Sequence, residues 1–93
     1  MDKAEVKQID DFLIEVREGL CEGDGDAALR LYLTELYRVI QRLMDATFAS
    51  QDQELKVLLA GLEYETRLRK QEIEGRLGGG IERTFSRWRR FNA

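Results

Sequence analysis

Residues 26–50 read DAALRLYLTELYRVIQRLMDATFAS, and the spacing of their apolar side chains decides the fold class. A leucine or isoleucine recurs every three or four residues, at Leu29, Leu33, Leu36, Ile40 and Leu43. This spacing forms one continuous stripe along an α-helix and fits no β-strand. Such a stripe is stable only when it is covered. The function therefore depends on whether the cover is the rest of this chain, a second copy or another protein.

Two other stretches repeat the pattern. The first helix is predicted over residues 3–21, and its apolar positions are Val6, Ile9, Leu13, Val16 and Leu20. A third helix is predicted over residues 52–77, with apolar positions that include Leu55, Leu58, Leu59, Leu62 and Ile73. Together with a second helix over residues 26–49, these segments predict an all-α, antiparallel bundle of three helices spanning residues 1–77.

The predicted helix ends carry recognisable capping residues. Asp2 followed by Glu5 resembles a capping box, in which each side chain binds the other residue's backbone N–H. Gly23-Asp24-Gly25-Asp26 predicts a turn, with Asp26 as the N-cap of the second helix. Ser50 or Asp52 can cap the third helix. Because no glycine or proline enforces a break there, one continuous helix through residue 77 is the alternative.

The third helix changes character along its length. Its first half is rich in leucine, whereas residues 63–74 are densely charged. We therefore expect the second half to be solvated and to project beyond the bundle.

The C-terminal residues differ from the predicted bundle. Gly78-Gly79-Gly80 predicts a hinge, and residues 81–93 form a basic, aromatic tail with four arginines and one glutamate. A short amphipathic fourth helix is expected there, because Ile81, Phe85 and Trp88 share one helical face. The tail can fold back on the acidic residues 1–26, dock on a partner protein, or bind nucleic acid or an anionic membrane.

Composition narrows the classes of function. The 93 residues carry a net charge of −3 and include 43% hydrophobic and 35% charged side chains, one cysteine, and no histidine or proline. Catalysis is poorly supported without histidine, the commonest general base and metal ligand, and we expect no cofactor or metal. The single cysteine, Cys21, excludes an intramolecular disulfide framework. With no apolar run of transmembrane length and no signal peptide, the sequence favours the cytoplasm.

The layout resembles that of FliT-type flagellar export chaperones, which are allied to type III secretion chaperones. The resemblance covers most of the chain. It comprises an apolar first helix, the turn Gly23-Asp24-Gly25-Asp26-Ala27-Ala28, a leucine-rich second helix, and a long third helix that runs into Glu63-Tyr64-Glu65-Thr66-Arg67-Leu68-Arg69-Lys70-Gln71. It implies that an exposed apolar groove binds an aggregation-prone helical partner, and it implies no enzyme activity.

The function expected from the sequence is non-enzymatic protein binding. A small cytoplasmic chaperone or adaptor would offer an apolar helical groove to a partner helix. The residues expected to bind the partner are Leu55, Leu58, Leu62, Tyr64, Phe85, Arg87, Trp88, Arg89 and Arg90. Self-association is also expected, with a dimer favoured. The alternatives are a self-assembling structural protein and, less favoured, an accessory protein that binds nucleic acid or a membrane surface through its tail.

Overall fold

A computed structural model describes residues 1–78, which form three α-helices joined by short turns. The helices are α1 (Lys3–Glu22), α2 (Asp26–Ala49) and α3 (Gln53–Leu77). The all-α class and the three-helix bundle are thus confirmed for the described part of the chain. The predicted fourth helix and the tail, residues 81–93, lie outside the described residues, as do Gly79 and Gly80 of the predicted hinge.

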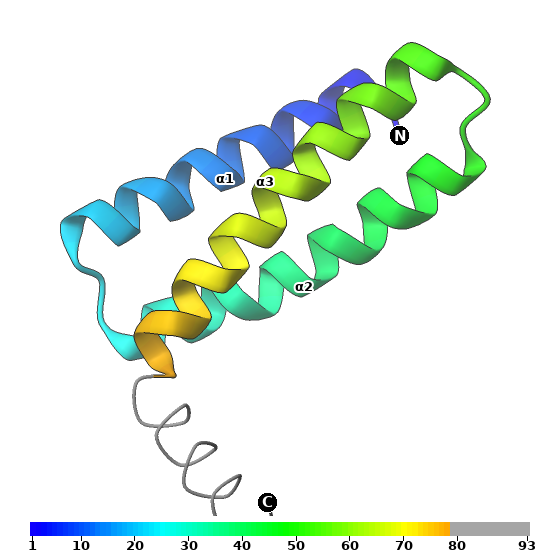
Figure 1. Ribbon diagram of the computed structural model, residues 1–93. Coiled ribbons are helices and arrows are strands. Elements are labelled where there is room, and N and C mark those ends of the chain that lie inside the picture. The colour runs from blue at the N-terminus through cyan, green and yellow to red at the C-terminus, as the bar shows by residue number, and fades with distance from the viewer. Residues whose placement is uncertain (79–93) are drawn as a thin grey trace, which may run out of the picture.

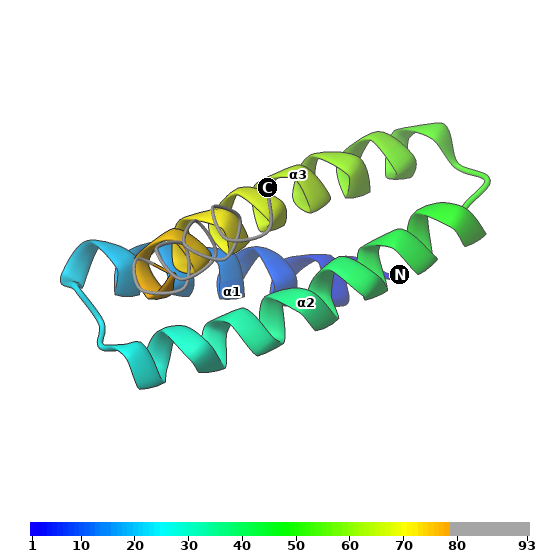
Figure 2. The same ribbon diagram turned by 60° about the horizontal axis from the view of Figure 1, so that its bottom comes forward.

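The three helices share one core. α1 and α3 run in the same direction, and α2 runs opposite to both (Figure 1). α3 passes between α1 and α2 in Figure 1, and Figure 2 shows the same three helices from another side. The buried residues common to the core are Ile9, Leu13, Val16 and Leu20 of α1, Leu29, Leu36, Val39 and Leu43 of α2, and Leu59, Leu62 and Ile73 of α3. The stripe in residues 26–50 is therefore covered by the chain's own helices.

α1 begins with only half of the expected capping box. The Asp2 carboxylate accepts a hydrogen bond from the Glu5 backbone N–H at 2.8 Å. The expected second contact, from the Glu5 carboxylate to the Asp2 backbone N–H, is replaced by an ion pair. The Glu5 carboxylate lies 3.3 Å from the Arg42 guanidinium of α2. Glu5 therefore links two helices, and this ion pair is half-exposed, so its contribution to stability is small.

The turn between α1 and α2 requires two glycines. Gly23 ends α1 with φ of 78°, in the left-handed region that glycine favours. Gly19, inside α1, leaves room for a hydrogen bond of 3.0 Å from the Tyr32 hydroxyl to Asp24. A Cβ at residue 19 would stand 2.5 Å from the Asp24 carboxylate and 3.0 Å from the Tyr32 ring. Gly19 therefore leaves space beside the end of α1 for the Tyr32 side chain and for the Asp24 carboxylate of the turn.

Two other predicted features of the helix ends are resolved by the structure. The N-cap of α2 is Gly25, and Asp26 is the first helical residue, so the prediction of Asp26 as the cap is wrong. The chain does break between α2 and α3. Asp52 caps α3 by accepting hydrogen bonds from the backbone N–H groups of Glu54 and Leu55, at 3.0 and 3.4 Å. This cap compensates for the absence of glycine or proline at the break.

The expectation that the second half of α3 projects into solvent is wrong. Ile73 and Thr66 are fully buried there, and the Thr66 hydroxyl donates to the Leu62 carbonyl at 2.6 Å, which satisfies its hydrogen-bonding need. The Tyr37 hydroxyl of α2 donates to Glu74 at 3.0 Å. The charged residues lie along the flanks of α3, whereas a single row of buried side chains is enough to hold it on α2.

Candidate functional site

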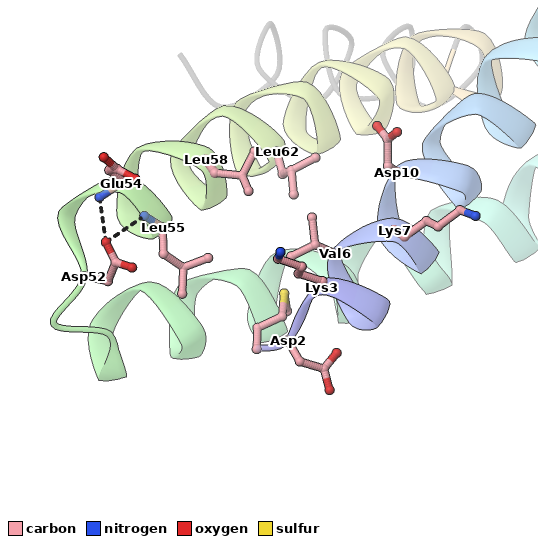
Figure 3. A pocket seen from close by; sticks show the side chains of 11 residues that line it. Asp2, Lys3, Val6, Lys7, Asp10, Asp52, Glu54, Leu55, Leu58 and Leu62 are labelled. Atoms are coloured by element: carbon pink, nitrogen blue, oxygen red, sulfur yellow. Dashed lines mark hydrogen bonds between the residues drawn. The ribbon is translucent and has the colours of Figure 1, made fainter.

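An open groove lies between the first half of α1 and the first half of α3 (Figure 3). Its volume is about 940 Å³. It exists because α3 packs more closely on α2 than on α1. α1 and α3 run parallel, so the beginnings of both helices meet at the same end of the bundle.

The floor of the groove is apolar. It consists of Met1 and Val6 from the α1 side and Leu55, Leu58 and Leu62 from α3. Val6 and Leu62 point toward one another across it (Figure 3). Leu62 is buried, whereas Leu58 is 50% exposed. Leu58 therefore offers apolar surface that the bundle itself leaves half uncovered.

The rim of the groove is charged. Its acidic residues are Asp2, Asp10, Asp52 and Glu54, and its basic residues are Lys3 and Lys7. Four carboxylates and two ammonium groups give these side chains a net charge of −2. Asp2 and Asp52 are held in place by capping their helices. An apolar floor with an acidic rim favours a ligand that is apolar on one face and basic at its edges.

Within residues 1–78, no group of three or more histidine, cysteine, aspartate or glutamate side chains is placed to hold a metal ion. Cys21 is exposed at the far end of α1. A hydrogen bond to Asp24 raises the pKa of Tyr32, and a hydrogen bond to Glu74 raises the pKa of Lys70. Neither of these residues lines the groove: the Lys70–Glu74 contact lies within α3, and the Tyr32–Asp24 contact joins α2 to the turn before it.

The groove brings together three of the predicted partner-binding residues, Leu55, Leu58 and Leu62. Tyr64 is not among its lining residues; it is 67% exposed on the opposite face of α3. The predicted tail residues Phe85, Arg87, Trp88, Arg89 and Arg90 lie outside the described residues.

Sequence reasoning missed the contribution of α1 to this site. Val6 belongs to the stripe that predicts the first helix, so its apolar role was evident. What the stripe does not reveal is that Val6 faces the leucines of α3. That neighbourhood depends on how α3 is placed against α1 in the bundle, which no local pattern encodes.

Comparisons of the chain with protein-family models, with curated proteins and with solved structures find no match. Within residues 1–78, no helix is long and apolar enough to cross a membrane. The function is therefore inferred from the groove and from the exposed surfaces of the helices.

Proposed function

We propose that this chain is a non-enzymatic protein-binding module that receives a helical segment of a partner protein in the groove between α1 and α3. The observation that carries the proposal is the half-exposed Leu58, which lies among Val6, Leu55 and Leu62 in an open groove. Apolar side chains grouped in this way bind amphipathic helices in other helical recognition modules.

The groove also specifies the chemistry of the partner. A helix laid between α1 and α3 would place an apolar row, spaced by three or four residues, against Val6 and Leu58. Lysine or arginine beside that row would face Asp2, Asp10, Asp52 and Glu54, which outnumber Lys3 and Lys7. We therefore expect the bound segment to be an amphipathic helix with basic flanks.

We further propose that the protein acts as a small cytoplasmic chaperone or adaptor. Covering an aggregation-prone amphipathic helix until it reaches its destination is a task that needs a groove and no catalytic group. This role agrees with the resemblance in layout to FliT-type flagellar export chaperones, and on that resemblance the partner would belong to a flagellar or type III export system.

The test compares three forms of the chain as bait in extracts of its own cells: wild type, Leu58→Glu and Leu31→Glu. Leu31 is the matched control because it is 73% exposed on α2 and does not line the groove. A captured protein is then purified, and its affinity for each form is measured by calorimetry. Leu58→Glu should weaken binding by at least about tenfold, the effect of removing one interface anchor.

Two further results are required. Leu31→Glu should bind like the wild type, and the bound segment should carry a helical apolar row with basic neighbours. Equal binding by wild type and Leu58→Glu would overturn the proposal, as would a failure to retain any protein. Sedimentation of the same three forms tests the alternative function, a self-assembling structural protein. That alternative expects a large oligomer that forms without any partner.

A further inference from the structure

The sequence of this chain contains a segment with the chemistry that the groove between α1 and α3 selects. In the tail, Ile81, Phe85 and Trp88 are separated by four and three residues, which would place them in one row on a helix. Residues 81–93 also carry four arginines against one glutamate, a net charge of +3. The groove rim has the opposite sign, with four carboxylates against two ammonium groups. The tail therefore has the apolar row and the basic flanks expected of a ligand for this groove.

The apolar row of the tail also matches the groove floor in spacing. Leu55, Leu58 and Leu62 are separated by three and four residues, the reverse of the order in the tail. A bound helix antiparallel to α3 would therefore bring each apolar residue of the tail row to the level of one leucine. Phe85 would stand at the level of Leu58, the leucine that the bundle leaves half-exposed. Both rows span seven residues, about 10 Å along a helix.

The groove is too far from the end of α3 for the chain's own tail to bind in this way. Leu58 lies 20 residues before Gly78, which is about 30 Å along α3. A fully stretched connection from Gly78 to Ile81 spans about 10 Å, and a helix from Ile81 to Trp88 adds about 10 Å. An extended tail would be long enough, but it would turn Phe85 and Trp88 to opposite faces, because an odd number of residues separates them.

We infer that the tail row binds in the groove of a second copy of the chain, an inference that rests on the function proposed for the groove. The groove lies at the beginning of α3, and the tail follows the end of α3. Two bundles that lie antiparallel thus place the end of each α3 beside the groove of the other. Each tail fills one groove, and the exchange closes as a two-fold dimer. Two linked contacts hold this dimer more tightly than one tail in one groove would.

The first test is sedimentation of the full chain from about 1 µM to about 100 µM, a range that reveals a micromolar dimer. Wild type should become dimeric. Leu58→Glu in the groove and Trp88→Gln in the tail should each weaken dimerisation by at least about tenfold. Trp88→Gln keeps the charge of the tail, so its effect isolates the apolar anchor. Leu31→Glu should dimerise like the wild type, because Leu31 is 73% exposed on α2 and does not line the groove.

The second test shows which copy supplies the tail and which the groove. Trp88 is the only tryptophan, so the Trp88→Gln chain has an intact groove and no tryptophan emission. The Leu58→Glu chain has an altered groove and an intact tail. Adding Trp88→Gln to Leu58→Glu, up to about 1 mM, should shift the emission of Trp88 to shorter wavelengths as its indole leaves water for the groove. The double variant Leu58→Glu/Trp88→Gln, added in the same way, should cause no shift.

Three results would overturn the inference. A wild-type chain that stays monomeric at about 100 µM forms no such dimer. A wild-type Trp88 emission that is shifted equally at every concentration would show that the tail binds to its own chain. An unshifted Trp88 emission when the two single variants are mixed would place Trp88 outside the groove of the second copy.

The tail exchange and the proposed function can fail separately. If Trp88 emission stays unshifted in the mixture while Leu58→Glu still loses a captured protein, the tail exchange is wrong and the proposed function stands. If Trp88 enters the groove of the second copy and no other protein is captured, the groove serves dimerisation and the proposed binding of a different protein is wrong.

Discussion

The two flanks of α3 differ in how completely they are covered. Toward α2, contacts continue along the helix: the Arg67 guanidinium lies 3.6 Å from the Met44 sulfur, and the Lys70 ammonium lies 5.0 Å from the centre of the Tyr37 ring. Toward α1, a hydrogen bond of 2.6 Å from Arg76 to the Leu20 carbonyl joins the C-terminal ends of the two helices. At the opposite end the same flank opens into the groove.

This difference shows that leucines with similar spacing can have different roles. Leu59 is fully buried, whereas the adjacent Leu58 is half-exposed in the groove. The covered flank holds the fold together, and the open flank leaves apolar surface for a partner. Substitutions on the covered flank should therefore affect stability, and substitutions on the open flank should affect binding.

The largest expected effect comes from a charge in the shared core. Leu36→Asp places a carboxylate where the side chain is 0% exposed. Burying an unpaired charge costs at least several kcal/mol, which is comparable with the whole stability of a small domain of about 5–15 kcal/mol. We expect circular dichroism to show loss of the cooperative thermal transition.

The control for this change is Leu31→Asp, the same substitution on the same helix at a residue that is 73% exposed. Its melting temperature should stay within a few degrees of the wild-type value, because surface substitutions usually change stability by about 0.5 kcal/mol or less. Similar melts for the two variants would contradict the assignment of the buried face of α2.

An intermediate effect on stability is expected where the C-terminal end of α3 contacts the C-terminal end of α1. Arg76→Met keeps most of the side-chain length but removes the donor to the Leu20 carbonyl, one of the carbonyls at the C-terminal end of α1. A hydrogen bond from a charged donor at a helix C-terminus contributes about 1–2 kcal/mol. Chemical denaturation should show a loss of this size, and amide hydrogen exchange should accelerate in the last turn of α1.

Arg38→Met is the matched control, because the exposed Arg38 side chain pairs with Glu35 of its own helix, at 3.5 Å. Pairs of this kind contribute a few tenths of a kcal/mol. If hydrogen exchange in α1 accelerates equally in both variants, the contact between Arg76 and Leu20 does not hold α1 in place.

The smallest effect on stability is expected in the open groove. Leu58→Glu should cost no more than about 1 kcal/mol, because half of the leucine surface already faces solvent. The same substitution should remove partner binding. Urea denaturation measures the free energy of unfolding of this variant. A loss of stability approaching that of Leu36→Asp would mean that Leu58 belongs to the core and that the groove is closed in solution.

Much of this fold was predictable from local patterns. The spacing of Leu29, Leu33, Leu36, Ile40 and Leu43 predicted a helix over residues 26–49, where α2 is found. The predicted first and third helices agree with α1 and α3 to within one residue at each end. Hydrophobic periodicity and glycine turns are local properties, so a single sequence is enough to reveal them.

Part of the candidate site was also predictable, since Leu55, Leu58 and Leu62 share one side of α3 by spacing alone. Tyr64 was grouped with them because aromatic residues often anchor interfaces, yet it lies on the opposite face. Periodicity determines which residues share a face. It does not determine which face another helix will cover.

Only the tertiary structure decided that Val6 joins these leucines, that Leu58 stays half uncovered, and that Thr66 is buried in a charged stretch. The physical reason is that burial depends on three helices at once. Each helix turns its apolar stripe toward the common core, but the distances between helix axes depend on the side chains that interlock at every contact. α3 packs closely on α2 and less closely on α1, and the groove is the space left by that difference.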